Sequence, residues 1–144
     1  ALLDCCILLG LCWTSMNATA SAATILIVDD EPALLRLVTR VLERDGYTTL
    51  SAKAGDEAIV TFDKHLDEID GAILDIVIPP NGVEEVLDHM MAARPGLMLV
   101  FVSGDEPDYA LAKKIQLHGG VFLRKPFLPT ALLELVVQGL AARR

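Results

Sequence analysis

From Thr24 onward, short runs of β-branched or aliphatic residues alternate with amphipathic stretches of about a dozen residues. This alternation is typical of repeated βα units, in which helices join the strands of a parallel sheet. The third and fourth runs are apolar almost throughout, as expected of strands that helices cover on both faces. The pattern predicts five strands, over Thr24 to Val28, Thr48 to Ala52, Ile69 to Leu74, Leu97 to Val102 and Gly120 to Leu123.

Between these strands, apolar residues recur at helical spacing. They predict helices around residues 34–42, 56–65, 83–90, 107–117 and 129–140. Pro32 and Pro107 suit first helical turns, and Gly119 suits the position just past a helix end. We therefore expect one doubly wound α/β domain, with a five-stranded parallel sheet between two layers of helices.

Composition narrows the classes of function. The chain has 144 residues, of which 53% are hydrophobic, enough for one continuous core. Its 20 acidic and 12 basic residues give a net charge of -8, and the basic residues look scattered rather than gathered into a stripe. Direct binding to nucleic acid is therefore not expected. All three cysteines lie near the amino terminus, so the rest of the chain has no disulfide or thiolate metal site, and we expect a cytoplasmic setting.

Residues 1–23 read as an N-terminal appendage, disordered or non-native, outside a domain of residues 24–144. Ala1 to Trp13 is almost wholly apolar, but it is short for a membrane span and Asp4 interrupts it. It also lacks the initiating Met and basic leading region of a signal peptide. We favour Met16 as the true start, with residues 1–15 derived from a vector or an upstream reading frame.

Polar residues follow four of the predicted strands. Asp29 and Asp30 come after the first strand, Asp75 after the third, Ser103 after the fourth and Lys125 after the fifth. The carboxyl ends of parallel strands share one edge, where sheets of this kind bind ligands. Three carboxylates there repel one another unless a cation lies among them, and an all-oxygen set suits Mg²⁺. The Lys125 ammonium and the Ser103 hydroxyl could bind the oxygens of a phosphoryl group carried by Asp75.

Each of these residues also has a purely structural interpretation, which is the commoner one for a residue taken alone. Asp30-Glu31-Pro32 could cap a helix, Asp75 could be a turn residue and Ser103 could bond the loop backbone. Lys125 could be a solvated side chain. Their joint placement at one sheet edge favours the phosphoryl site.

Four segments resemble the signature motifs of response-regulator receiver domains. They are Ile25 to Pro32 (ILIVDDEP), Ile73 to Ile76 (ILDI, with Pro79 four residues after the Asp), Val102 to Gly104 (VSG) and Lys125 to Phe127 (KPF). The resemblance covers about Thr24 to Arg144, and it implies the flavodoxin-like receiver fold. It also implies a phosphorylation switch of a two-component phosphorelay, which catalyses only its own phosphorylation and dephosphorylation.

By this resemblance, Asp75 accepts the phosphoryl group from a sensor histidine kinase or a histidine phosphotransfer protein. Asp30, Asp75 and the Val77 carbonyl would bind Mg²⁺, and Asp29 would act through a water on the metal. The loop of residues 76–82 is one residue shorter than the family's usual form.

The resemblance also assigns a switch. Ser103 and Lys125 would bind the phosphoryl oxygens, and Ser103 would move with Phe122, which stands where many members carry Tyr. The bond before Pro126 is expected to be cis. The switch would change a surface made by the helix of residues 107–117, the strand of 120–123 and the helix of 129–140. That surface would dock a downstream protein target or form a homodimer.

Other functions remain alternatives. The domain could be a detached receiver of a hybrid kinase or of a transcription regulator, although we favour a stand-alone regulator. An Asp-nucleophile, Mg-dependent phosphohydrolase of the haloacid-dehalogenase group needs a second Asp two residues after the nucleophile, on the first strand. Here Val77 follows Asp75 at that distance, and the first strand ends in adjacent Asp29 and Asp30. A receiver-like module that is never phosphorylated would lack acidic or Lys residues of the pocket, and none of them is missing here. Nucleotide binding would need a Gly-rich phosphate loop, which this sequence does not contain.

Overall fold

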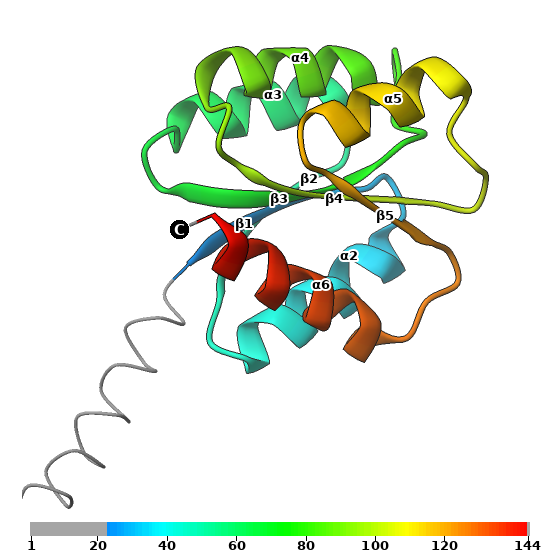
Figure 1. The fold of residues 1–144 in the computed structure, drawn as a ribbon. Coiled ribbons are helices and arrows are strands. Elements are labelled where there is room, and N and C mark those ends of the chain that lie inside the picture. Colours follow the sequence, from blue (N-terminus) through cyan, green and yellow to red (C-terminus); the bar gives the residue numbers. More distant parts are fainter. Residues whose placement is uncertain (1–22, 144) are drawn as a thin grey trace, which may run out of the picture.

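The computed structural model describes residues 23–143, with helices and strands labelled as in Figure 1. Five parallel strands form one sheet in the order β2-β1-β3-β4-β5. The strands are β1 (Thr24–Val28), β2 (Thr48–Ala52), β3 (Ile69–Asp75), β4 (Met98–Ser103) and β5 (Val121–Arg124). The strand order reverses between β1 and β3, so the ligand edge of this doubly wound sheet lies at their carboxyl ends.

Helices cover both faces of the sheet, as predicted. Figure 1 shows α2 (Pro32–Arg44) and α6 (Pro129–Ala142) on one face. The opposite face is covered by α3 (Gly55–Lys64), α4 (Val83–Ala93) and α5 (Tyr109–Leu117). Among the described residues, no helix is both long and apolar enough to cross a membrane.

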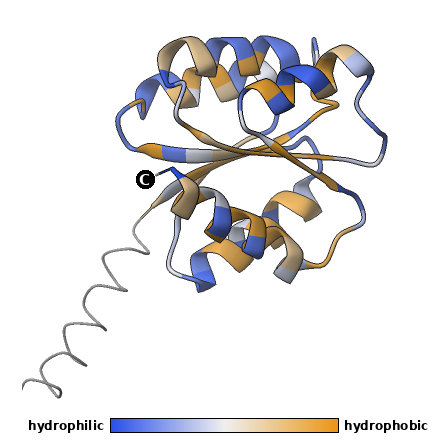
Figure 2. Ribbon diagram, viewed as in Figure 1, coloured by the Kyte–Doolittle hydropathy of each residue, from blue (hydrophilic) through white to orange (hydrophobic). Residues whose placement is uncertain are grey.

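Two apolar cores fill the spaces between the layers, because successive residues of a strand point to opposite faces. Ile25 and Ile27 of β1 pack in the core beneath α2 and α6, whereas Leu26 and Val28 pack in the core beneath α3, α4 and α5. Figure 2 shows the strands as largely hydrophobic and the outer helix faces as hydrophilic. The apolar runs that predicted the strands are thus explained by burial on both sides.

Several boundaries differ from the prediction. Pro107 lies before α5 rather than in its first turn, because Asp108 is the N-cap and its Oδ1 accepts a hydrogen bond from the Leu111 N–H at 2.8 Å. β4 and β5 each begin and end one residue later than predicted, and β3 includes Asp75. Gly119 does follow the end of α5, with a positive φ of 72°. Except for residue 23, the predicted appendage and Met16 fall outside the described residues.

Candidate functional site: an acidic cluster at the carboxyl edge of the sheet

Two buried carboxylates lie side by side at the ends of neighbouring strands. Val28 pairs with Leu74 in the β1–β3 register, so Asp29 and Asp75 are the next residues along each strand. The Asp29 N–H still donates to the Ala52 carbonyl of β2 at 3.1 Å, which fixes its backbone to the sheet edge. Asp29 and Asp75 are only 2% and 5% exposed. The sheet therefore holds two acidic groups where solvent screens them poorly.

The backbone of each following loop stabilises one oxygen of these carboxylates. Asp29 Oδ1 accepts a hydrogen bond from the Glu31 N–H at 2.8 Å, and Asp75 Oδ1 accepts one from the Val77 N–H at 3.0 Å. Both bonds are local turns of the kind that Asp side chains form with the backbone two residues on. They fix the direction in which each carboxylate points.

Lys125, the residue directly after β5, joins the two carboxylates. Its Nζ lies 2.9 Å from Asp29 Oδ2 and 3.0 Å from Asp75 Oδ2. The Lys125 N–H donates to the Ser103 carbonyl at 2.8 Å, which continues the β4–β5 pairing and positions the side chain toward the cluster. The solvated interpretation of Lys125 is therefore wrong, since its ammonium forms an ion pair with both buried acids.

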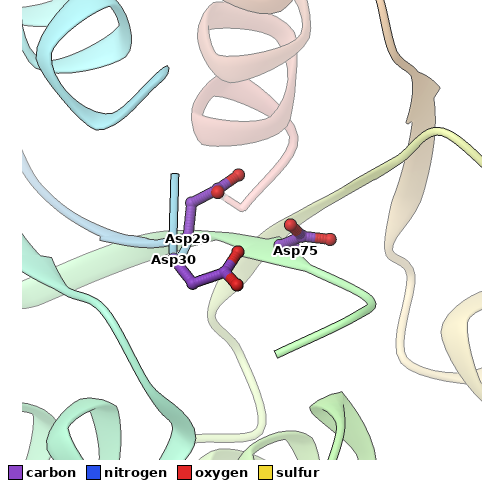
Figure 3. A group of neighbouring side chains, drawn as sticks. All are labelled: Asp29, Asp30 and Asp75. Carbon is purple, nitrogen blue, oxygen red and sulfur yellow. The ribbon is translucent and has the colours of Figure 1, made fainter. Parts of the chain in front are cut away.

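Asp30 completes an oxygen cluster. One carboxylate oxygen from each of Asp29, Asp30 and Asp75 lies within 4.8 Å of the others, and Figure 3 shows the three side chains gathered at this edge. Within residues 23–143, it is the one such group of His, Cys, Asp or Glu side chains. Asp30 does not cap α2, whose N-cap is Glu31, and Glu31 makes no side-chain cap bond. Three hard oxygen donors without nitrogen or sulfur fit Mg²⁺.

Burial and charge shift the pKa values in this cluster. Burial raises the pKa of Asp75, and the charge of Asp29 adds to that effect, whereas hydrogen bonds from Lys125 and Val77 oppose it. For Lys125, desolvation on its own lowers the pKa, but the hydrogen bonds and charges of Asp29 and Asp75 outweigh it and the pKa is raised. The site is thus rich in negative charge, with a charged lysine beside it.

Ser103 is at the same edge but is not joined to the acids by a hydrogen bond in this structure. Its side chain is buried, and its Oγ accepts a hydrogen bond from the Asp105 N–H at 3.2 Å. The hydroxyl therefore bonds the loop backbone here, as its structural interpretation predicted.

Residues 25–137 match the family model of the response regulator receiver domain. The chain belongs to this family. The match begins at the second residue of β1 and ends within α6, so it includes each residue of the acidic cluster.

Individual relatives of this receiver support the same assignment. It is 32% identical to the sensor kinase CckA of Brucella abortus over 109 residues, which cover 75% of this chain and 11% of that protein. It is 30% identical to the transcriptional regulatory protein CssR of Bacillus subtilis over 112 residues, covering 76% of this chain and 48% of that one. The chain thus spans half or less of these relatives' length.

A solved structure agrees with the fold. The receiver resembles the crystal structure of a CheY-like response regulator receiver domain protein from Methanospirillum hungatei JF-1, with a TM-score of 0.75 and 28% identity. The alignment covers 85% of this chain and 96% of that one.

The expected switch aromatic lies on the edge strand of the receiver. Phe122 is half-buried and packs against the core beneath α3, α4 and α5. The Lys125-Pro126 bond is cis, as predicted, and the Pro79-Pro80 bond is also cis, which the sequence analysis did not predict. Val77 is 64% exposed at the rim of the site.

Two basic residues near the expected docking surface form ion pairs that the sequence did not predict. Lys114 Nζ of α5 lies 2.5 Å from Asp88 Oδ1 and 3.7 Å from Glu84 Oε2, both on α4. Arg124 Nη1 lies 3.2 Å from Glu106 Oε1 of the β4–α5 loop. No local sequence signal links these partners, because they come together only when α4, α5 and β5 pack on the sheet.

Proposed function

We propose that residues 24–144 form a receiver that accepts a phosphoryl group on Asp75 and reports it through a changed docking surface. The observation that supports this most strongly is the contact of Lys125 Nζ with both Asp29 and Asp75, beside the exposed carboxylate of Asp30. This arrangement combines an acceptor oxygen, a fixed cation and a set of metal-binding oxygens at one sheet edge.

Asp75 is the proposed acceptor because it ends β3, which lies between β1, followed by Asp29 and Asp30, and β5, followed by Lys125. In the transfer, one Asp75 carboxylate oxygen forms a bond to phosphorus while the bond from phosphorus to the donor histidine nitrogen breaks. The electron pair of that bond stays on the imidazole. Lys125, whose pKa is raised, remains charged and stabilises the negative phosphoryl oxygens. No separate substrate is turned over, so the receiver is not proposed to be an enzyme in the ordinary sense.

Mg²⁺ is the proposed cofactor, held by Asp30, Asp75 and the Val77 carbonyl, with Asp29 acting through a bound water. When bound, Mg²⁺ neutralises charge on the phosphoryl oxygens during transfer. The chain's own contribution is to hold the Asp29 and Asp75 carboxylates in fixed directions through the N–H groups of Glu31 and Val77.

The proposed output depends on Ser103 and Phe122. Ser103 would exchange its bond with the Asp105 N–H for one to a phosphoryl oxygen, and Phe122 would rotate into the space that Ser103 leaves. The surface made by α5, β5 and α6 would then change. It would dock a downstream protein target or a second copy of the receiver.

The donor is proposed to be a sensor histidine kinase or a histidine phosphotransfer protein, and the setting is proposed to be cytoplasmic. Relatives include both a sensor kinase and a transcriptional regulatory protein. The same receiver chemistry would serve either context.

Acetyl phosphate with Mg²⁺, followed by intact-mass analysis, tests the proposal. The parent should gain one phosphoryl group and Asp75→Asn should gain none. Asp67→Asn removes an exposed carboxylate outside the cluster and serves as the matched control, which should behave as the parent does. Equal phosphorylation of Asp75→Asn and the parent would refute the proposal.

A further inference from the structure

A small hollow lies between the start of α3 and the loop that leads from β3 into α4. The apolar part of its lining consists of Ile59, Val60, Pro80 and Val86. Two exposed acids, Asp56 and Glu85, also line it. Its volume of about 280 Å³ is below the roughly 300–1,000 Å³ of small-molecule sites. The hollow is therefore better matched to a side chain of a partner molecule than to a free ligand.

Val60 gives the hollow an exposed apolar edge. It is 53% exposed and belongs to neither of the two cores. Val86, which lines the same hollow, is buried and belongs to the core beneath α3, α4 and α5. An apolar surface thus runs from solvent at Val60 down to Val86. An aliphatic side chain of a partner in the hollow would remove this surface from water, which is how the anchor residues of protein interfaces contribute to binding.

Two hydrogen bonds hold the walls of the hollow together. The Gly55 N–H of α3 donates to the Pro79 carbonyl at 2.8 Å, which fixes the start of α3 against the loop of residues 76–82. Asn81 Nδ2 donates to Glu85 Oε2 at 3.1 Å, which fixes the same loop against α4. The hollow is thus preformed, so a partner that enters it does not have to order the loop first.

The two acids of the hollow and the neighbouring Glu57 have no cationic partner among residues 23–143. Asp56 and Glu57 are in the first turn of α3, and Glu85 is in the first turn of α4. Asp56 and Glu57 each accept a backbone N–H, but no described basic side chain lies within ion-pair distance of any of the three. Within that range they also form no metal-binding group. Their charge therefore suits basic side chains spread over the surface of a partner.

The two helical layers of the molecule differ in charge. α3 and α4 carry three further exposed acids, namely Asp63, Glu84 and Asp88. The exposed face of α2 instead carries a row of three arginines, Arg36, Arg40 and Arg44. The expectation that basic residues form no stripe is therefore wrong for α2, which lies on the far side of the sheet in Figure 1. A basic partner is attracted to α3 and α4 and repelled by α2, which orients it before contact.

The same charges disfavour other occupants. Nucleic acids and anionic membrane surfaces are negatively charged, so the acids around the hollow repel both. A second copy of this chain has a net charge of -8 and is repelled as a whole. A basic protein segment is attracted, and an aliphatic side chain within it fits the apolar lining.

We propose that this hollow docks a basic segment of a partner protein. One aliphatic side chain of the segment enters the hollow and packs on Val60, while lysine or arginine side chains on either side of it pair with the three acids Asp56, Glu57 and Glu85. The hollow is separate from the surface made by α5, β5 and α6, and it includes no residue of the acidic cluster. The inference therefore goes beyond the proposed function and does not depend on it.

Two peptides of seven residues test the inference by NMR titration of the isotope-labelled full chain. The first has leucine at its centre and three lysines on each side, and the second has serine in place of the leucine. The parent should bind the leucine peptide about tenfold more tightly than the serine peptide, because one aliphatic side chain leaves water. Backbone amide shifts should change most at residues 55–60 and 79–86, which include the lining of the hollow.

Matched pairs of variants separate the apolar contact from the charges. Val60→Ser should reduce the preference for the leucine peptide by about threefold, because half of the apolar contact is lost. Val137→Ser changes a residue of α6 that is 46% exposed and lies outside the hollow, and it should keep the preference.

The charged variants should weaken both peptides rather than change the preference. Asp56→Asn/Glu85→Gln should lower both affinities about fivefold at low salt, because two ion pairs are lost. Asp67→Asn/Glu134→Gln removes the same charge from exposed residues outside the hollow and should leave both affinities near those of the parent.

No binding of the leucine peptide, equal binding of both peptides by the parent, or an equal effect of Val60→Ser and Val137→Ser would overturn the inference. Amide shifts centred on α5, β5 and α6 would overturn it as well. Sedimentation that increases with protein concentration, and that Val60→Ser and Arg40→Gln each abolish, would overturn it in favour of a second copy of this chain.

Discussion

Lys125 Nζ lies 3.0 Å from Asp75 Oδ2, although 50 residues separate them in the sequence. The contact exists because β4 lies between β3 and β5, so that Lys125 reaches across the end of one strand. The lysine opposes, but does not cancel, the effect of burial on the pKa of Asp75, which remains raised. In the metal-free protein, an ionised Asp75 therefore lowers the stability of the fold.

That shift predicts how stability depends on pH. Because the pKa of Asp75 is raised on folding, the folded state binds more protons than the unfolded state just above the ordinary pKa of Asp, about 4. The parent's stability should fall as pH rises through that window. Asp75→Asn removes this loss, so its stability advantage over the parent should grow with pH. Urea unfolding in EDTA at several pH values measures it, with Asp67→Asn as the control. An advantage that shrinks as pH rises would contradict a raised pKa of Asp75 in the folded protein.

Magnesium binding should depend on Asp30. Asp30→Ala removes one of the three clustered carboxylates and should weaken Mg²⁺ affinity by about tenfold or more, with a parallel loss of phosphorylation. Titration calorimetry measures the affinity. Glu31→Ala removes the neighbouring carboxylate, which is outside the cluster, and should leave affinity near that of the parent. Equal affinities for Asp30→Ala and the parent would show that Asp30 is not a ligand.

The sequence predicted the fold well, because burial on both faces leaves a strong local signal. The nearly unbroken apolar runs of β3 and β4 identified both strands and placed Asp75 and Ser103 at their ends. The predicted start of α5 was wrong because Asp108 caps the helix, so that Pro107 lies before it. The contact of Lys125 with Asp29 spans 96 residues, so no local pattern could reveal it.

Phe122 should couple phosphorylation to the surface. Phe122→Ala should still be phosphorylated, but hydrogen exchange in α5 and β5 should no longer change on phosphorylation, because no bulky ring moves into the space left by Ser103. Leu123→Ala is the matched control, since Leu123 packs against the other core from the same strand. A normal exchange response in Phe122→Ala would rule out this aromatic as the switch.

The lifetime of the phosphoryl group should depend on Val77. Water must approach phosphorus in line with the Asp75 oxygen, and the β-branched apolar side chain of Val77 at the rim cannot orient it. Val77→Asn should speed loss of phosphate by at least about threefold, or roughly 0.7 kcal/mol of barrier. The decay is followed by intact mass after removal of the donor. Unchanged or slower decay would show that Val77 does not control the rate of phosphate loss, and Asp105 or the loop of residues 76–82 would become the candidate.

The central claim is that Asp75 carries the phosphoryl group, and chemical trapping tests it most directly. Borohydride reduces an aspartyl phosphate to homoserine, and peptide mass spectrometry then locates the modified residue. After incubation with acetyl phosphate and Mg²⁺, homoserine should be found at position 75 alone, and its yield should fall when Mg²⁺ is removed. Homoserine at position 29 or 30, or a phosphorylated protein with no homoserine at position 75, would contradict the account.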